Sequence, residues 1–376
     1  MINYGEVTKF YGLKFRNLHI PFSGSFELTP RCNMNCKMCY IRMDEKEMEK
    51  VGHELPVEEW IRIAREAVAA GMTMVLLTGG EAILYKGFKQ FYLELRKMGV
   101  LISINTNGTL FNDKWIEFFR ENPPLKFNIT IYGGSNETYA QLCGNPSGFD
   151  QLKRNVELLQ SNGFDIMLNC TITKQNMHDM ENIFNFGREH NLTVHTTTYN
   201  FPPVRKEGID DPALSRMTAT EAAKARIFLN WCAVHNDTKF KLSGQATLNQ
   251  ISQAHPTEDD CGEIVGDRVL CAAGRSNFWV TWDGRMLPCG MLPDMSFPLR
   301  DRPFKDVWQK VVAETGKITL APECKRCKKN SICKPCAAKL KSETGFYDQK
   351  APYLCQYQDE YIRLLGEAKK YLEQNS

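Results

Sequence analysis

The sequence has little that would direct it to a membrane or out of the cell. It contains no run of about 18 or more apolar residues, the length that a membrane-spanning helix needs. Residues 1–6 lack the basic and then apolar segments that begin a secretory signal peptide. The 47 basic and 44 acidic residues leave a net charge of only +3, which gives no global argument for binding nucleic acid or acidic lipid. We therefore expect a cytoplasmic protein with neither nucleic acid nor a membrane as a partner.

Several common catalytic signatures are also missing. The seven histidines form no HxxxH or HExxH pattern, and the sequence shows no Ser-His-Asp pattern and no phosphate-binding loop. What is left has the composition of a globular protein. A chain of 376 residues with 43% hydrophobic content can bury a large core, and we expect two domains.

Cysteine, in contrast, is abundant. Fourteen cysteines in a cytoplasmic chain indicate metal binding rather than disulfides. Three lie within residues 32–39, eight lie between residues 261 and 355, and three stand alone. We expect these single thiols, Cys143, Cys170 and Cys232, to be buried or unused because none has a partner at ligand spacing.

The first group of cysteines has the spacing CxxxCxxC. Cys32, Cys36 and Cys39 follow a short extended stretch. Three thiolates on one loop can hold three irons of a 4Fe–4S cluster and leave the fourth iron without a protein ligand. Such an open iron can bind a small molecule and pass one electron to it. A zinc site is the alternative, although zinc sites usually pair one CxxC with a second CxxC or an HxxxH.

Residues 25–198 alternate β-rich runs with amphipathic helical patterns. Six β-then-α repeats predict an α/β fold with a parallel sheet, which right-handed crossovers curl into a partial (β/α)6 barrel. The C-terminal ends of its strands would carry the chemistry. The expected strands are residues 25–29, 73–78, 101–105, 126–131, 165–172 and 192–198. A helix over residues 57–70 should end at Gly71, another should start at a capping box of Thr218 and Glu221, and a last one should follow Cys355.

A Gly-Gly-Glu turn, Gly79 to Glu81, follows the second expected strand. Gly79 and Gly80 would let a ligand approach the backbone closely, and the Glu81 carboxylate can accept hydrogen bonds from an ammonium group. Taken alone, the same residues also suit a strand–turn–helix junction with a capping glutamate. Because this turn lies one β/α unit after the cysteine loop, both are expected on the same rim of the barrel.

Together, the cysteine loop and the Gly-Gly-Glu turn resemble the radical S-adenosylmethionine (radical SAM) enzymes. In that family the cluster donates an electron to the sulfonium of S-adenosylmethionine (SAM) and methionine leaves. The resulting 5′-deoxyadenosyl radical takes a hydrogen atom from an unactivated carbon. The resemblance implies that the three cysteines bind the radical cluster and that the Gly-Gly-Glu turn binds the amino group of the cofactor's methionine moiety.

Five further residues are candidate cofactor contacts on the same rim. Ser103, Asn105 and Thr130 lie toward the ends of the third and fourth expected strands, where they would meet ribose hydroxyls or the cofactor carboxylate. Ordinary strand-end turn chemistry is the alternative for all three. Met38 and Tyr40 flank the third cysteine and would lie near the adenine, or else pack in the core.

The cysteines near the C-terminus resemble the SPASM extension of radical SAM enzymes, which carries auxiliary 4Fe–4S clusters, two in the arrangement expected here. The resemblance implies an outer cluster bound by Cys324, Cys327, Cys333 and Cys355, and an inner one bound by Cys271, Cys289 and Cys336. The fourth ligand of the inner cluster would be Cys261, or its fourth iron would stay open. One departure from the family pattern is that two residues, rather than the usual three, separate Cys333 from Cys336. A zinc ribbon over residues 324–336 is the alternative.

Basic residues run through this C-terminal cysteine region. They are Lys325, Arg326, Lys328, Lys329, Lys334, Lys339 and Lys341. A 4Fe–4S centre with four thiolates carries net negative charge, and nearby cations offset that charge and raise the reduction potential. A docking surface for an acidic peptide, or simply a solvated basic face, are the alternatives.

The resemblance covers nearly the whole chain and implies its organisation. We expect an N-terminal extension over 1–24, a radical SAM barrel over 25–200 and a bridging region over 201–260. A SPASM domain over 261–360 and a C-terminal helix over 361–376 would follow. Only about 25 residues precede the cysteine loop, so we expect no winged-helix domain for a leader peptide at the N-terminus.

Most relatives with this layout modify peptides, so we expect an oxidoreductase that oxidatively modifies or cross-links a ribosomally made peptide. Its electron donor would be a flavodoxin or a ferredoxin. Sulfatase-maturing enzymes are one alternative, but they carry an aspartate directly after the cysteine that corresponds to Cys289, where this chain has Gly290. A small-molecule dehydrogenase or decarboxylase is another. A non-catalytic metal-binding protein would have no need of the Gly-Gly-Glu turn.

Overall fold

A parallel sheet of six strands forms the centre of the molecule. The computed structural model describes residues 14–202, 204–205, 215–235, 263–265, 268–333 and 335–375. The six strands are β1 (Ser23–Glu27), β2 (Met74–Thr78), β3 (Leu101–Thr106), β4 (Lys126–Thr130), β5 (Ile166–Thr171) and β6 (Val194–Thr197). Each pairs in parallel with the next, in sequence order. The predicted α/β partial barrel is confirmed, and every expected strand overlaps an observed one.

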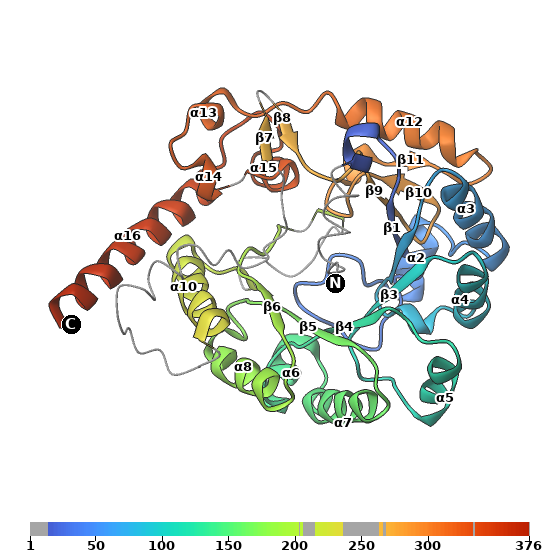
Figure 1. Cartoon of the computed structure of the whole chain (residues 1–376), viewed down its shortest axis with the longest axis horizontal. Helices are drawn as coiled ribbons and strands as arrows, with labels where there is room; N and C mark the ends of the chain where they lie inside the picture. Colours follow the sequence, from blue (N-terminus) through green and yellow to red (C-terminus); the bar gives the residue numbers. More distant parts are fainter. Residues whose placement is uncertain are drawn as a thin grey trace.

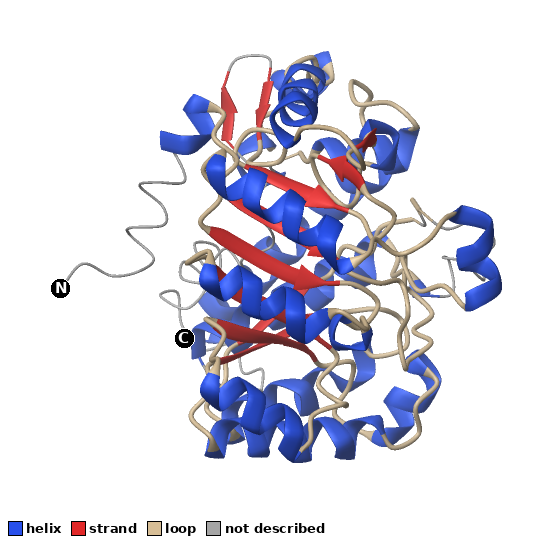
Figure 2. Ribbon diagram, turned by 90° about the vertical axis from the view of Figure 1, so that its right-hand side faces the viewer, coloured by secondary structure: helices blue, strands red, loops and turns tan. Residues whose placement is uncertain are grey.

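Helices pack around the outside of this sheet, as Figures 1 and 2 show. In chain order they are α2 (Glu45–Val51), α3 (Val57–Ala69), η1 (Ala82–Leu84), α4 (Phe88–Lys97), α5 (Asp113–Glu121), α6 (Asn136–Cys143), α7 (Gly148–Ser161), η2 (Met177–Asp179) and α8 (Met180–Glu189). Helix α3 illustrates why they form: Trp60, Ile63 and Ala64 recur at helical spacing and are fully buried. Phe26 of β1 stacks on Trp60, with 5.4 Å between ring centroids, so the main core lies between sheet and helices.

The helix boundaries largely follow the sequence signals. Helix α3 ends at Ala69, and Gly71 follows with a positive φ of 118°. Helix α10 (Ala219–His235) begins at the predicted capping box, in which the Glu221 carboxylate accepts from the Thr218 backbone (2.7 Å) and the Thr218 hydroxyl accepts from the Glu221 backbone (3.2 Å). The last helix, α16 (Pro352–Asn375), departs from expectation. It begins before Cys355 and includes it, because Pro352 is suited to the first helical turn.

The C-terminal part of the chain extends the same sheet. Strand β9 (Asn277–Val280) pairs in parallel with the outer edge of β1, and β10 (Arg285–Leu287) and β11 (Phe297–Pro298) continue the sheet in antiparallel fashion. The strand order is therefore β11-β10-β9-β1-β2-β3-β4-β5-β6. Residues on both sides of the boundary expected at position 261 thus share one sheet. Strands β7 (Glu263–Val265) and β8 (Arg268–Leu270) form a separate hairpin.

Helices from the C-terminal region cover both ends of this sheet. They are η3 (Pro293–Met295), α12 (Phe304–Thr315), α13 (Pro322–Lys325), α14 (Asn330–Cys333), α15 (Ala337–Thr344) and α16. Helix α12 lies beside α3, next to β9, whereas α16 packs along α10 near β6 (Figure 1). Two buried hydrogen bonds fix α16 there: Asn230 donates to the Tyr361 hydroxyl at 3.0 Å, and the hydroxyls of Thr198 and Tyr357 lie 3.0 Å apart.

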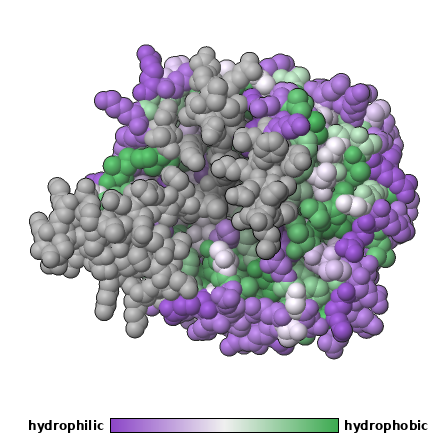
Figure 3. Space-filling model, in the orientation of Figure 1, coloured by the Kyte–Doolittle hydropathy of each residue, from purple (hydrophilic) through white to green (hydrophobic). Residues whose placement is uncertain are grey.

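In the face drawn in Figure 3, hydrophilic residues occupy much of the margin. Across the helices that the structure describes, none is both long and apolar enough to cross a bilayer.

Candidate active site

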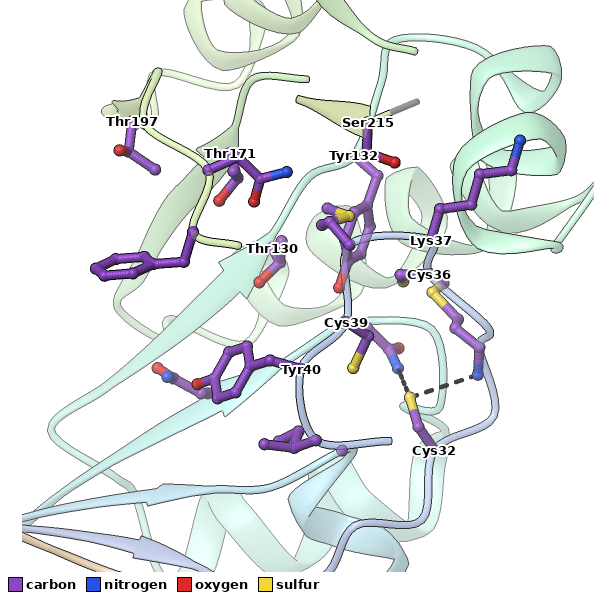
Figure 4. A pocket seen from close by; sticks show the side chains of 18 of the residues that line it. Cys32, Cys36, Lys37, Cys39, Tyr40, Thr130, Tyr132, Thr171, Thr197 and Ser215 are labelled. Atoms are coloured by element: carbon purple, nitrogen blue, oxygen red, sulfur yellow. Dashed lines mark hydrogen bonds between the residues drawn. The ribbon is translucent and has the colours of Figure 1, made fainter. Parts of the chain in front are cut away.

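A cavity of about 350 Å³ lies at the C-terminal ends of the parallel strands. One wall is the loop that carries Cys32, Cys36 and Cys39, and the ends of β2 to β6 supply others. Met291 and Lys339 reach the cavity from the C-terminal region. Figure 4 shows the three cysteines on their loop, with Tyr40, Thr130 and Thr171 nearby. The sequence prediction that cysteine loop and strand ends share one rim is therefore met by the geometry.

The cysteine loop connects β1 to α2 without regular secondary structure, and hydrogen bonds to its sulfurs shape it. The Cys32 sulfur accepts from the Met34 backbone at 3.4 Å and from the Asn107 side chain at 3.7 Å, and these bonds meet at Cys32 in Figure 4. The Cys39 sulfur accepts from the Arg42 backbone at 3.3 Å. N–H donors of this kind stabilise a thiolate, the form that binds iron.

Helix α6 supports the loop from the opposite side. The backbone N–H groups of Asn35 and Lys37 donate to the carbonyls of Cys143 and Leu142, both at 2.9 Å. Cys143 is fully buried, as expected, but it is also in contact with the cluster loop, because its thiol hydrogen-bonds to Cys36. That bond lowers the pKa of Cys36, whereas burial raises the pKa of Cys32 to about 12. Cys170 is buried too, and the Cys232 side chain lies outside the described residues.

The three thiols of the cysteine loop line one cavity. In the described part of the chain, no three His, Cys, Asp or Glu side chains close around one metal position. A core of four irons and four sulfides is wider than a single ion, so its thiolates must stand further apart than those of a zinc site. The donor set, three thiolates that face one cavity, fits a 4Fe–4S cluster with one open iron.

Gly79 and Gly80 of the Gly-Gly-Glu turn line the cavity, and the structure adds a second reason for them. The Gly80 N–H donates to the Thr29 carbonyl at 2.7 Å, and the Glu81 N–H donates to the Arg31 carbonyl at 2.8 Å. A Cβ at Gly79 would lie 2.5 Å from the Thr29 oxygen, and one at Gly80 would lie 2.5 Å from the Arg31 oxygen. The two glycines therefore let the start of the cysteine loop pack directly against the turn.

Glu81 is fully buried and only half satisfied. Its Oε2 accepts from the Thr106 hydroxyl at 3.0 Å and from the Asn107 backbone at 2.8 Å. Its Oε1 has no hydrogen-bond partner among the described residues, and its side chain does not cap η1. Burial raises the pKa of this carboxyl to about 7, against the opposing interactions with the backbone N–H groups of Asn107 and Ile83 and with the Thr106 hydroxyl. A buried carboxylate oxygen without a donor fits the ammonium group of SAM.

The other candidate contacts divide into two groups. Met38, Tyr40, Asn105 and Thr130 line the cavity. Ser103 is buried and is not part of the cavity lining, because it lies two residues, or about 7 Å, before Asn105 along β3.

Sequence analysis missed several lining residues. Tyr132, Thr171 and Thr197 come from the ends of β4, β5 and β6, so the rule that selected Thr130 would have found them. Tyr199 and Phe201, just beyond β6, carry no such signal.

Four of the C-terminal cysteines lie close to one another. Cys324, Cys327 and Cys355 lie close enough to Cys333 for their charges to interact, and burial raises the pKa of Cys333 to about 11. Cys336 precedes α15, and the sulfurs of Cys271 and Cys289 accept backbone N–H groups at 3.5 Å. Cys289 is also close enough to Tyr40 to interact electrostatically, which brings the C-terminal region to the cofactor cavity. Cys261 lies outside the described residues.

We expect Glu81→Ala to weaken SAM binding by roughly 1.5–3 kcal/mol, or about 10-fold to 150-fold, the scale of a hydrogen bond to a charged group. Equilibrium binding of SAM to the reconstituted protein measures this, and the iron content should stay normal. The exposed Glu117→Ala on α5 is the matched control and should bind SAM normally. Unchanged affinity in Glu81→Ala would leave Glu81 with only a structural role in the turn.

The same carboxylate predicts a pH dependence. Because its pKa is about 7, the charged form that attracts an ammonium group is lost below that pH, and affinity should fall by about tenfold per pH unit. Glu81→Gln should bind weakly with no such slope. The stability of the protein without cofactor should change with pH in the opposite direction. Between pH 4.5 and 7 the native state keeps a proton on Glu81 that the unfolded chain has released, so the free energy of unfolding falls as the pH rises through this range.

Comparisons with known proteins agree with this site. The profile described as "Radical SAM superfamily" matches residues 26–187. An AdoMet-dependent heme synthase from Methanosarcina barkeri is 24% identical over 88% of this chain and 95% of its own length. The sporulation killing factor maturation protein SkfB of Bacillus subtilis is 24% identical over 82% of this chain and 69% of its own length.

Solved structures share the fold. Streptococcus suis SuiB bound to its precursor peptide SuiA superposes with a TM-score of 0.64, at 16% identity, over 95% of this chain and 82% of that one. The matched segment begins within β1 and contains the cysteine loop, the Gly-Gly-Glu turn and the ends of β3 to β5. Residues 26–187 are therefore a radical SAM domain.

Proposed function

We propose that this enzyme oxidatively modifies or cross-links a peptide, using a radical that it generates from SAM. When bound, the 4Fe–4S cluster and SAM supply a 5′-deoxyadenosyl radical. Cys32, Cys36 and Cys39 would hold that cluster, and Glu81 would orient the methionine moiety. Electrons would come from a flavodoxin or a ferredoxin in the cytoplasm, where thiols stay reduced.

The observation that carries this proposal is that barrel and C-terminal region build one cavity together. Met291, two residues after Cys289, and Lys339 of α15 line the same space as the cysteine loop. Tyr199 and Phe201 add aromatic surface, which keeps water from a reactive radical. Lys339 lies over the Tyr199 ring, 4.6 Å from its centroid, and supplies positive charge for a substrate carboxylate. SkfB is named as a sporulation killing factor maturation protein, and the SuiB structure contains a precursor peptide.

Auxiliary clusters complete the proposal. Cys324, Cys327, Cys333 and Cys355 would bind the outer one, and Cys271, Cys289 and Cys336 would bind the inner one. Their positions suit electron removal from a substrate radical, since Cys289 stands near Tyr40 at the cavity. The fourth ligand of the inner cluster would be Cys261, or the fourth iron of that cluster would have no protein ligand.

Sulfatase maturation is the less favoured activity because a side chain at Gly290 would crowd the Trp279 ring. A Cβ at this position would approach the Trp279 ring to 3.1 Å. Trp279 is itself fixed, since its indole N–H donates to Glu27 at 2.8 Å. The aspartate that follows the corresponding cysteine in sulfatase-maturing enzymes would therefore require the tryptophan to move.

A second candidate is oxidation or decarboxylation of a small carboxylic acid. The heme synthase from Methanosarcina barkeri aligns over nearly its whole length, and Lys339 would suit the carboxylate of such a substrate equally well. The first candidate activity consumes a peptide and the second consumes a small carboxylic acid, so one experiment separates them.

The test incubates the protein anaerobically with SAM, dithionite and a short peptide encoded beside its gene. A loss of about 2 Da per modification, from removal of two hydrogens, supports the oxidative proposal, whereas unchanged mass with deuterium uptake from solvent indicates epimerisation. Turnover of iron-coproporphyrin or another carboxylic acid, with every peptide unchanged, would move the assignment to the second candidate.

Removing an auxiliary ligand should separate radical formation from product formation. We expect Cys324→Ala and Cys333→Ala to retain some 5′-deoxyadenosine formation while product is lost, because these residues would serve a cluster remote from SAM. Cys170→Ala, which removes a buried thiol outside every proposed cluster, is the control and should retain product. Circular dichroism must show that the variants fold, since metal binding and folding are coupled. Normal product yield in both variants would remove the auxiliary cluster from the mechanism.

A further inference from the structure

Asn107 lies between the cysteine loop and the Glu81 carboxylate. It follows β3 directly and is 4% exposed. Its backbone N–H donates to Glu81 Oε2 at 2.8 Å. Its side-chain Nδ2 donates to the Cys32 sulfur at 3.7 Å and to Asn33 Oδ1 at 2.8 Å. One residue therefore contacts a cluster ligand through its side chain and the expected SAM-binding group through its backbone.

The orientation of the Asn107 amide is fixed by its neighbours. Its Oδ1 accepts from the Thr109 backbone at 3.0 Å and from the Thr109 hydroxyl at 2.7 Å. That hydroxyl in turn accepts from Asn33 Nδ2 at 2.9 Å. With the oxygen engaged by Thr109, both amide hydrogens must face the cysteine loop. An inverted amide would turn its acceptor oxygen toward a thiolate and lose these bonds.

We propose that Asn107 is a positioning residue that couples SAM binding to the reduction potential of the radical cluster. A hydrogen bond to a ligating sulfur withdraws negative charge and favours the reduced cluster. The peptide unit that carries Asn107 is held by Glu81 Oε2, and Glu81 Oε1, which has no hydrogen-bond partner among the described residues, would accept the ammonium group. An ammonium group bound there would offset the negative charge of Glu81, and Asn107, which contacts both Glu81 and Cys32, would transmit the change to the cluster ligand. The inference rests on the site roles proposed above but not on any substrate.

Thermodynamic linkage makes the proposal measurable. If SAM shifts the potential, the reduced and oxidised proteins must bind SAM with different affinities, by the factor that corresponds to that shift. Substitution of Asn107 should therefore reduce both the SAM-induced shift in potential and the difference in SAM affinity between the reduced and oxidised proteins. A residue that only supports the fold has no reason to change both in proportion.

The experiment uses the reconstituted full-length protein without any peptide. An anaerobic redox titration, followed by electron paramagnetic resonance, monitors the signal that responds to added SAM. Asn107→Ala removes the side-chain donor, and Asn107→Asp replaces it with a carboxylate of the same shape. Both retain the backbone N–H to Glu81. The control is Asn155→Ala, a buried amide that donates to the Gly108 carbonyl at 2.8 Å and so supports the same turn without contacting Cys32.

We expect the potential to become more negative in Asn107→Ala, and further so in Asn107→Asp, whose charge repels the thiolate. The SAM-induced shift should be largely lost in both, and Asn155→Ala should keep wild-type values. Wild-type potentials in both Asn107 variants would overturn the proposal, as would an equal change in Asn155→Ala. Because the redox titration contains SAM but no peptide, its result does not depend on the peptide assay. A negative redox result would likewise leave the proposed peptide modification untouched.

Discussion

Replacing Cys32, Cys36 and Cys39 together with alanine is expected to abolish cleavage of SAM by the dithionite-reduced protein. These three thiols are the protein ligands expected for the cluster that contacts the cofactor, and without them no electron reaches the sulfonium. With one radical and two auxiliary clusters, the variant should also lose about a third of its iron, since one of three 4Fe–4S centres is gone. The measurements are 5′-deoxyadenosine by chromatography and iron per chain.

The control for this experiment is Cys170→Ala, because Cys170 is buried on β5 and takes no part in the loop. It should retain both iron and cleavage. Continued formation of 5′-deoxyadenosine by the triple variant would mean that another group reduces SAM and would remove the assignment of the loop.

The second large effect concerns the buried ion pair between Glu27 and Arg205. The guanidinium of Arg205 makes two bonds to the Glu27 carboxylate, at 2.7 and 2.8 Å, and Trp279 adds a third at 2.8 Å. Glu27 is fully buried and the Arg205 side chain is 11% exposed. The guanidinium also lies 5.8 Å from the centroid of the Tyr40 ring. The pair thus joins the end of β1, a residue beyond β6 and strand β9 beside the cofactor cavity.

We expect Arg205→Met to lower the free energy of unfolding by about 3–5 kcal/mol, because it leaves the Glu27 charge buried without its partner. Urea unfolding of the protein without cofactors measures the change. The matched control is Lys317→Met, which removes an exposed pair with Glu314 and should cost less than about 1 kcal/mol. The double variant with Glu27→Gln should recover part of the loss. A cost for Arg205→Met as small as that of the control would show that the pair is dispensable.

Local sequence signals predicted the barrel and its rim well. The six strands, the Thr218 capping box and the clustering of cysteines and glycines at one rim follow from periodicity and from parallel strands ending on the same side. Glu81 lies at a buried position where its Oε1 has no hydrogen-bond partner among the described residues, and its role in binding the cofactor stays a prediction. These features depend on residues close together in the chain, or on a repeat that fixes their places.

Contacts between distant segments could not be predicted in this way. Nothing near Glu27 indicates Arg205 or Trp279, which are 178 and 252 residues away. The contact between Cys143 and the cysteine loop depends on how α6 packs, and a lone cysteine carries no spacing signal. The glycines of the turn were given to the cofactor, whereas the structure shows that the loop backbone also requires them. Tertiary packing decides these cases, and a single sequence contains no record of it.

The parallel pairing of β9 with β1 has a consequence for how the chain is made. Residues 23–26 leave the ribosome early, but their outer hydrogen-bonding partners are residues 277–280. Until that segment is synthesised, β1 is an unprotected edge, and Phe26 lacks its contact with Phe278. The barrel therefore matures only when the C-terminal third arrives, so a nascent chain that stalls before residue 277 would present an aggregation-prone edge to chaperones and proteases.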